Sequence, residues 1–410
     1  MQSHTPFTTP HKDRITSVAT NTTHTRLLTT SIDHRIAVYH TPHPRASQAH
    51  PPTLLDLFTA HDAQIYAATF LPTPPGTATF IASIAADLSL RIFTEDVSQQ
   101  LMSGRRFRRL TTIRSETFTP FVSLDTKTTS HNDATAVATA TIYIAAIDRQ
   151  GLLSLYEPSE PEQYKDWSLL HRFHVSPSIP PRGVPATFKL CFDPTLLPLP
   201  YVTSHSDDRA QLSLFVLAND RVKVYRSTDP SDHNPATRRS SLTPGYHITR
   251  AAVQPPLFVE VLSIDCSNKD ANNNNDDDST TTTHRLTLKA IAVAPLHHRD
   301  HDLIALASST GSLSIYSITL APHSHTDTTT HKSSIAPSDD EQISLFGYAH
   351  AARLVWAAPR AHRGGCCAVK WHRDGRTLLS TGADGTVKIW RKHSESHWEC
   401  AVEKKSGEMG

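Results

Sequence analysis

Short stretches in which apolar and polar residues alternate recur along the whole chain. The clearest follows the pair Asp384-Gly385, where Val387 and Ile389 alternate with polar residues up to Trp390. A period of two is typical of a strand with one buried face. An Asp-Gly pair tolerates the positive backbone dihedrals of a tight turn. The stretch 380–392 therefore predicts half of a β-hairpin.

The spacing of this hairpin is repeated five more times. In each copy a turn residue stands six positions before an aromatic residue that closes an apolar-alternating strand. Two short apolar strands precede each copy, and a fourth strand can be placed after it, at 53–59, 105–113, 166–173, 257–265, 352–358 and 397–403. Six units of four strands indicate a repeat architecture. The five further pairs are Asp33 and Tyr39, Asp87 and Phe93, Gln150 and Tyr156, Asn219 and Tyr225, and Thr310 and Tyr316.

The units are unevenly spaced because polar, low-complexity segments separate them. Subtracting positions puts the closing aromatics 54 to 91 residues apart, more than the ~40–45 residues of a WD repeat. Such segments cannot build a core, and a rigid scaffold tolerates them because lengthening a loop costs little entropy. A helical pattern is weakly present only at 161–170. We place the insertions near 41–54, 125–136, 227–245, 266–284 and 321–342.

Four-stranded units repeated in this way predict an all-β fold, a WD40-type β-propeller of six blades, in which radial packing protects the sheet edges. We expect a single domain over residues 11–403, between a flexible N-terminus at 1–10 and a C-terminal tail at 404–410.

The last unit also carries the polar support of a WD blade. His362 precedes its first strand, Ser380 ends the second, Asp384 holds the turn and Trp390 lies on the third. We expect the imidazole to link the carboxylate to the hydroxyl, which accepts from the indole N–H. Leaving one of these buried groups unpaired would cost roughly 1–3 kcal/mol. His11 and His61 occupy the same place in units one and two, where Tyr39 and Phe93 replace the tryptophan and packing must contribute more.

Composition narrows the class of protein. Lys and Arg number 40 against 39 Asp and Glu, so no strong general attraction to nucleic acid or anionic lipid is expected. Five cysteines without a CxxC spacing point to a reducing compartment. The polar start resembles no signal peptide, and no apolar run reaches the ~18 residues of a membrane span. A soluble intracellular protein is expected.

Several stretches suggest a metal, phosphate or catalytic site, but the residues around them do not support one. The histidines at 296–301 suggest a metal, yet they fall between two strands, where a solvated loop is expected. The Asn- and Asp-rich run at 272–278 lacks the glycine turn and closing glutamate of a calcium loop. The basic run at 103–110 could touch phosphates, but we expect it to begin a fourth strand with arginines outward, or to contact acidic partners. Cys366-Cys367 has no nearby His–Asp arrangement. No catalytic, cofactor or metal site, and no enzyme activity, is expected.

Three longer stretches resemble the Seh nucleoporins, the SEC-thirteen homologues of the nuclear pore's Y-shaped scaffold. They are LMSGRRFRRLTTI at 101–113, DRQGLLSLYEPSEPEQYKDWSLL at 148–170 with SIPPRG just after it, and the final segment from His362 to Glu403. The similarity runs from His11 to Glu403 in blade order. It is close in units two, three and six and loose in units four and five.

The resemblance implies an open ring of six blades. A helical coat-type nucleoporin would insert a blade between blades one and six, and other Y-complex nucleoporins would join the assembly. This implies a scaffold at the nuclear envelope that serves protein and mRNA transport. It also implies a second assembly on the vacuolar or lysosomal membrane that regulates nutrient (TOR) signalling. It implies neither direct nucleic-acid binding nor a transmembrane segment.

Physical reasoning agrees with an inserted blade, because uncovered sheet edges are a liability that proteins normally cover. Addition of a partner's strands would cover them. We expect the partner-binding surfaces on blade one (about 11–40) and blade six (about 362–403).

Three other functions remain open. A coat propeller of secretory vesicles would share the open ring, but the segments at 101–113 and 148–170 favour the pore family. An adaptor propeller would present a peptide pocket on its central face. A propeller hydrolase would need clustered acid–base residues around the channel, for which no motif is visible. Identifying the stoichiometric partner that co-purifies with the native protein would distinguish the vesicle-coat and adaptor functions from the scaffold function. Turnover of a substrate by partner-free protein would establish the hydrolase function.

Overall fold

The structure, a computed structural model, describes residues 9–41, 51–73, 78–131, 139–160, 164–176, 187–194, 212–227, 258–266, 287–295, 301–322, 348–394 and 396–405. Within these residues the regular elements are 24 β-strands, which form six four-stranded antiparallel sheets. Each sheet contains four strands that are consecutive in the sequence. The all-β fold of six four-stranded blades predicted from the repeat is therefore confirmed.

The first three blades use the first half of the chain. Blade one contains β1 (Ile15–Thr20), β2 (Arg26–Ser31), β3 (Arg35–His40) and β4 (Thr53–Thr59). Blade two contains β5 (Ile65–Phe70), β6 (Phe80–Ala85), β7 (Ser89–Glu95) and β8 (Phe107–Arg114). Blade three contains β9 (Phe121–His131), β10 (Thr139–Asp148), β11 (Leu152–Pro158) and β12 (Trp167–His174).

The other three blades follow in the same order. Blade four contains β13 (Phe188–Phe192), β14 (Ser213–Ala218), β15 (Arg221–Ser227) and β16 (Phe258–Asp265). Blade five contains β17 (Leu288–Val293), β18 (His301–Ser308), β19 (Leu313–Pro322) and β20 (Tyr348–Ala358). Blade six contains β21 (Cys366–Trp371), β22 (Thr377–Gly382), β23 (Thr386–Lys392) and β24 (Trp398–Lys405).

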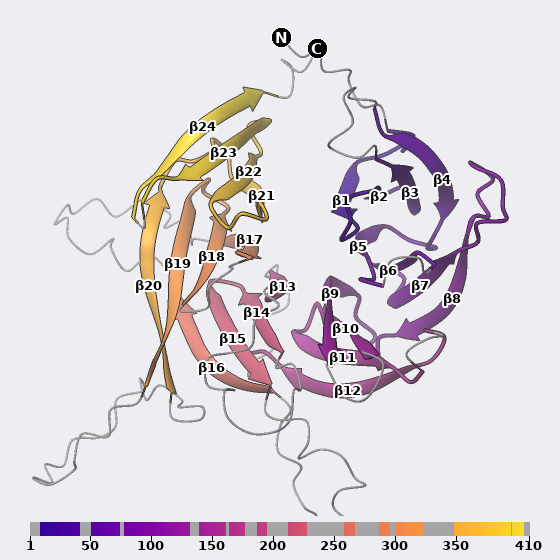
Figure 1. Ribbon diagram of the computed structural model, residues 1–410, viewed down its shortest axis with the longest axis horizontal. Helices are drawn as coiled ribbons and strands as arrows, with labels where there is room; N and C mark the ends of the chain where they lie inside the picture. Colours follow the sequence, from indigo (N-terminus) through magenta and orange to yellow (C-terminus); the bar gives the residue numbers. More distant parts are fainter. Residues whose placement is uncertain are drawn as a thin grey trace, which may run out of the picture.

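The blades are arranged around a central axis. Figure 1 shows the first strand of each blade nearest the centre and the fourth strand at the rim. Contacts join the inner strands of successive blades, from β1 to β5 and onward to β17 and β21. Blade six and blade one lie on opposite sides of the top of the ring in this view, and no strand is drawn between them.

The apolar core is divided among the junctions between blades. Five clusters of buried residues each lie between two successive blades, and none of these clusters of described residues spans blades six and one. The middle strands supply most of the core because both of their faces are covered. β6 and β14, for example, are buried at every position. Alternating residues therefore pack against the preceding blade and the following blade in turn.

The structure corrects two expectations. Residues 125–131 belong to β9 and pair with β10, so the insertion expected at 125–136 is wrong over these residues, and 132–136 lie outside the described residues. Every residue from Asp125 to His131 is polar, so the sequence lacks the apolar alternation of a strand and favoured a loop. The weak prediction of a helix at 161–170 is wrong for residues 167–170, because they belong to β12, which pairs with β11.

The other expected insertions lie mostly outside the described residues. β4 begins at Thr53, so only the last two residues of 41–54 belong to a strand, and 42–50 lie outside the described residues. Of the other three insertions, the structure describes Ser227, Cys266 and residues 321–322. Ser227 ends β15, and residues 321–322 end β19. The remainder of 227–245, 266–284 and 321–342 lies outside the described residues, as do most of 1–10 and of 404–410.

Candidate partner interface

Blade six is supported by a chain of polar contacts. The Ser380 hydroxyl lies 2.7 Å from Nε2 of His362 and accepts a hydrogen bond of 2.9 Å from the indole of Trp390. On the other side of the imidazole, Nδ1 lies 2.9 Å from the Thr386 hydroxyl and 3.4 Å from Asp384. Thr386 donates to Asp384 at 2.7 Å. The structure thus brings the four predicted residues together and adds Thr386 between the imidazole and the carboxylate.

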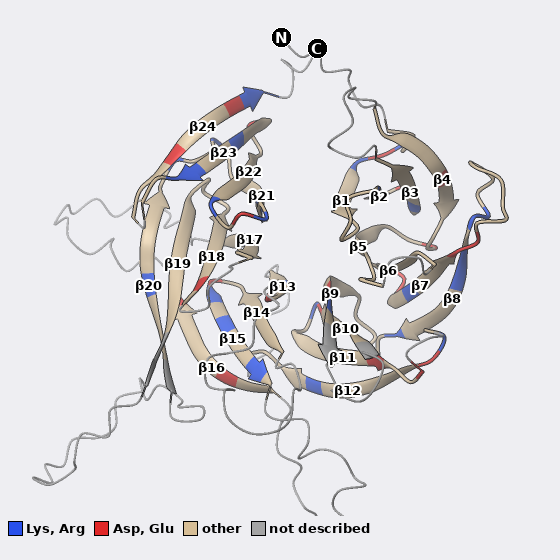
Figure 2. Cartoon of the chain, in the orientation of Figure 1, with Lys and Arg blue, Asp and Glu red and all other residues tan. Residues whose placement is uncertain are grey.

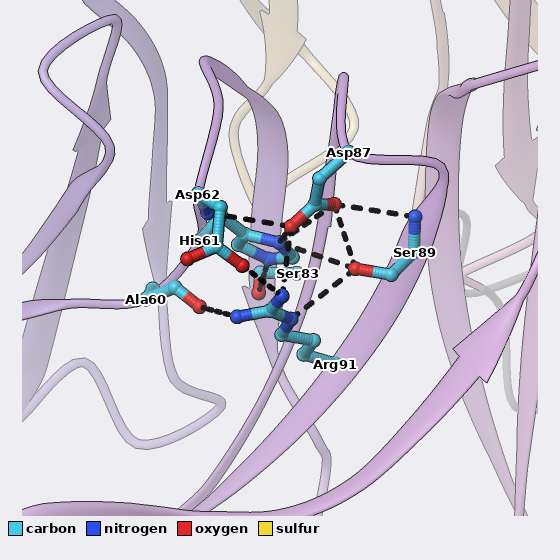
Figure 3. A network of polar contacts seen from close by, with 7 residues as sticks. All are labelled: Ala60, His61, Asp62, Ser83, Asp87, Ser89 and Arg91. Atoms are coloured by element: carbon cyan, nitrogen blue, oxygen red, sulfur yellow. Dashed lines mark hydrogen bonds and ion pairs between the residues drawn. The ribbon is translucent and has the colours of Figure 1, made fainter.

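Blade two carries an equally complete network without a tryptophan (Figure 3). Nδ1 of His61 lies 2.9 Å from Asp87, and Nε2 lies 2.8 Å from the Ser83 hydroxyl. Ser89 donates to Asp87 at 2.6 Å, as Thr386 does in blade six. Arg91 adds a salt bridge of 3.0 Å to Asp87. The polar support in this blade is therefore independent of Phe93.

Blade one uses a threonine and a tyrosine for the same purpose. His11 lies 3.2 Å from Asp33 through Nδ1 and 2.8 Å from the Thr29 hydroxyl through Nε2. Tyr39 is buried, and burial raises the pKa of its phenol while Thr29 acts in the opposite direction. The phenol therefore occupies the place that the Trp390 indole has in blade six.

Electrostatics in the networks of blades two and six favour a neutral imidazole beside a charged carboxylate. Burial lowers the pKa of His61 and of His362, although Asp87 and Asp384 act against the shift. Burial alone would raise the pKa of Asp384, but hydrogen bonds from Thr386 and the backbone of Arg363 hold it well below its usual range. A neutral imidazole has one donor and one acceptor, so Nδ1 donates toward the carboxylate and Nε2 accepts from the hydroxyl.

Blade three lacks the histidine and is capped differently. Gln150 lies in the turn, as predicted, but the buried carboxylate that caps the turn is Asp148. Asp148 accepts from the backbone N–H groups of Gln150 and Leu152 at 2.8 and 2.9 Å, and from the Thr117 hydroxyl at 2.6 Å. Thr117 thus replaces the imidazole. An Asp two residues before the expected turn position was the available sequence signal.

Blades four and five are held by still simpler groups. Asn219 has a positive φ of 61°, and its side-chain oxygen accepts from the backbone N–H of Thr187 at 3.2 Å. In blade five the Ser308 hydroxyl lies 2.8 Å from Thr310 and 2.6 Å from Ser312. The predicted turn residues Asn219 and Thr310 therefore do lie in their turns. The paired aromatics Tyr156 and Tyr225 are buried, and Tyr316 is partly buried.

Blade six differs from the other blades on the face turned away from blade five. On the third strand of every blade, the residues one and three positions before the closing aromatic lie on the face turned toward the following blade. In blades one to five both are fully buried, whereas Val387 and Ile389 of blade six are only partly buried. The ten buried counterparts are Ile36, Val38, Leu90, Ile92, Leu153, Leu155, Val222, Val224, Leu313 and Ile315.

The neighbouring strand shows the same difference more sharply. Leu379 pairs directly with Ile389 and is 38% exposed. The residues in the same register in the other blades are all 0% exposed: Leu28, Ala82, Ala145, Phe215 and Ala305. Ile389 in turn pairs with Val402 on β24. Leu379, Ile389 and Val402 thus form an apolar row across blade six that this chain leaves partly open to solvent.

Blade one has an uncovered residue on its opposite face. Val18 pairs with Thr29 and is 55% exposed. Its counterparts on the first strands of blades two, three, four and six are 3–9% exposed, and Ile291 of blade five is partly buried. These counterparts are Ala68, Leu124, Leu190 and Val369.

Blades six and one nevertheless approach each other through their loops. Arg373, after β21, donates to the backbone carbonyl of Thr22, after β1. Nearby, burial and the charges of Arg373 and Lys370 lower the pKa of His24. This contact involves loops and leaves the sheet faces around Leu379 and Val18 exposed.

Other predicted candidates fall outside this interface. Arg108 and Arg109 are exposed on β8, so the basic run enters a fourth strand with these two arginines outward, as expected, whereas Arg106 pairs with Glu95. All five cysteines are free thiols. Within the described residues no group of three His, Cys, Asp or Glu side chains could hold a metal ion, and no helix is long and apolar enough to cross a membrane. Most of the histidine-rich segment 296–301 and all of 272–278 lie outside the described residues.

The comparisons with known proteins now complete the assignment of the fold. The model of the WD domain, G-beta repeat, matches residues 3–40 and 357–391. The matched segments include β1 to β3 of blade one and most of β21 to β23 of blade six. The fold is therefore a six-bladed β-propeller in which two segments match the WD repeat. The chain is 23% identical to Nucleoporin SEH1 of Saccharomyces cerevisiae over 96% of this chain and 97% of that protein.

Two further proteins are similar over different lengths. Nucleoporin SEH1 of Chaetomium thermophilum is 28% identical over 47% of this chain, but the match spans only 32% of that longer relative. Chaetomium thermophilum Sqt1, solved bound to the N-terminus of the ribosomal protein L10, covers 97% of this chain and 76% of its own, with a TM-score of 0.49 and 15% identity. This last likeness is too low to add to the assignment. The chain is thus similar to proteins named Nucleoporin SEH1 and has two segments that match the WD repeat.

Proposed function

We propose that this chain is a structural scaffold subunit of the nuclear pore and receives strands from a partner between blades six and one. The uncovered face of blade six carries the proposal, because the counterparts of Leu379 and Ile389 are fully buried in the other blades. Exposed apolar sheet faces mark interaction sites. The similarity to Nucleoporin SEH1 over nearly the whole chain supports a nucleoporin role.

The occupant we propose is a short blade from a helical coat-type nucleoporin. A sheet of a few strands would cover Leu379 on one side and Val18 on the other. Other nucleoporins of the Y complex would bind through that partner at the nuclear envelope. A related assembly on the vacuolar membrane that regulates TOR signalling is the second setting we propose. The partner role is structural and requires no catalysis by this chain.

A purification with two matched variants tests this function. The tagged chain is isolated from its native cells, and stoichiometric partners are identified by mass spectrometry. Leu379→Asp combined with Ile389→Asp places charges on the uncovered face and should abolish recovery of the helical partner. Leu354→Asp, at a residue of β20 that is 50% exposed, is the control and should retain it. Unchanged recovery with the double variant would reject the proposal.

A further inference from the structure

The loop between β7 and β8, residues 96–106, presents apolar side chains to solvent. Val97 is 73% exposed, Leu101 59% and Met102 66%. Figure 1 shows this loop extending beyond the rim of the ring, away from the junction of blades six and one. Single exposed apolar residues are normal, but several on one projecting loop mark a contact surface.

The exposure is not a consequence of a loosely held loop. The fully buried carboxylate of Asp56 on β4 accepts from the backbone N–H of Gly104 at 2.7 Å and of Arg106 at 2.9 Å. The N–H of Met102 donates to the carbonyl of Leu55 at 2.8 Å. The loop is therefore fastened to blade one while its apolar side chains remain uncovered.

The backbone of Met102 supports a role for this exposed side chain. Its φ is 57°, in the left-handed region that favours glycine and costs free energy for other residues. Gly104, two residues later, also has a positive φ of 69°. Met102 thus keeps an unfavourable backbone conformation in a position where its side chain is mostly in water.

The apolar loop lies beside a positively charged strand. Arg105, Arg108 and Arg109 are exposed, whereas Arg106 is used internally in a 2.8 Å ion pair with Glu95. Asp96, the acidic residue of the loop, accepts from the N–H and hydroxyl of Ser98. Figure 2 shows Lys- and Arg-coloured segments along β8 and at the base of the loop. The local charge is therefore positive although the whole chain is nearly balanced.

We propose that loop 96–106 and these three arginines dock onto an anionic phospholipid bilayer. A projection with an apolar tip can enter the boundary between headgroups and acyl chains, and nearby cations are attracted to anionic headgroups. The guanidinium groups would bind lipid phosphates. The amide groups of Met102, Gly104 and Arg106 already have partners in blade one, which leaves the side chains to make the contact. This proposal is independent of the partner site on blades six and one.

Flotation of the purified full chain with lipid vesicles tests the proposal. Phosphatidylcholine vesicles containing phosphatidylserine should carry the chain upward, and vesicles of phosphatidylcholine alone should carry at least about tenfold less. Val97→Ser, Leu101→Ser and Met102→Ser in one chain should reduce flotation by about tenfold or more. Arg105→Gln, Arg108→Gln and Arg109→Gln together should do the same. Leu354→Ser, which removes an exposed leucine from blade five, should float like the unaltered chain.

Three results would overturn the proposal. They are no flotation of the unaltered chain, equal flotation of the loop variant, and binding of the loop to a protein without binding to vesicles. Circular dichroism and thermal unfolding of each variant show whether the fold is retained. Because the loop lies away from Leu379, the loop variant should still recover the helical partner, so that failure here is separable from failure of the scaffold function.

Discussion

The indole N–H of Trp390 donates to the hydroxyl oxygen of Ser380 across 2.9 Å, and both residues are buried. The same hydroxyl serves His362, so Ser380→Ala would leave two buried polar groups without this partner. We expect a loss of roughly 1–3 kcal/mol in the free energy of unfolding. Urea denaturation measures it. Ser396→Ala, at an exposed position after β23, is the control and should change stability by less than about 0.5 kcal/mol. Equal effects of the two substitutions would contradict the network.

Gly382 is expected to be essential for the same network because a side chain there has no space. A Cβ atom would lie 2.3 Å from Oδ1 of Asp384 and 2.4 Å from Nδ1 of His362. Gly382→Ala should therefore destabilise the protein by about 1–3 kcal/mol. In a His362→Ala background the same substitution should cost less, because the imidazole is absent. A double-mutant cycle measures the difference, and strict additivity would argue against this contact.

Blades four and five are joined by a buried ion pair between Arg226 and Asp302, 2.6 Å apart. The guanidinium also lies over the ring of Phe215, 5.4 Å from its centroid. Removing one member of a buried pair costs about 3–5 kcal/mol because the remaining charge stays in the interior. Asp302→Ala should therefore lower the free energy of unfolding by about this amount. Guanidinium denaturation provides the measurement, and a loss below about 1 kcal/mol would show that the pair contributes as little as an exposed one.

Stability should fall in mild acid because of His350. This imidazole is fully buried beside the ion pair, and neither ring nitrogen has a hydrogen-bond partner among the described residues. Burial and the charge of Arg226 lower its pKa to about 4, although Asp302 acts in the opposite direction. The unfolded chain binds the proton more readily than the folded chain, so the stabilisation is complete above about pH 6.5 and is lost progressively as the pH falls to about 4.

Unfolding measured at about pH 7.5 and about pH 5 tests the role of His350. The difference in stability between the two conditions should be smaller in His350→Phe, which cannot bind a proton. His61 and His362 contribute in the same direction because their pKa values are also lowered, so part of the dependence should remain. An identical pH dependence in the variant and the unaltered chain would exclude a contribution from His350.

The strand arrangement could be predicted from the sequence because both the local signals and their repetition specify it. A turn residue, a two-residue period and a closing aromatic are each weak, but six copies in one order are a strong constraint. The polar residues that cap the turn of a blade could be predicted only where they follow the common pattern, as in blade six. Blade three uses Asp148 and Thr117 instead, and the spacing rule selected Gln150 because that residue, not the aspartate, stands six positions before the aromatic.

The sequence predicted the partner-binding face only to the level of whole blades, not of individual residues. Leu379 and Ile389 follow the same apolar alternation as their counterparts in other blades, and nothing in their own sequence separates a buried position from an exposed one. The difference depends on which blade comes next in space. The extension of β9 to His131 was missed for a similar reason, because its polar residues gain their pairing from β10 and not from local apolar character.

The central claim is that blade six is left uncovered by this chain and is covered by another. The most direct measurement is the structure of the chain together with the partner that co-purifies with it. We predict foreign strands packed on Leu379 and Ile389, with Val18 facing the same inserted sheet. A ring in which blade six packs directly on blade one, burying these side chains without any other chain, would contradict the account.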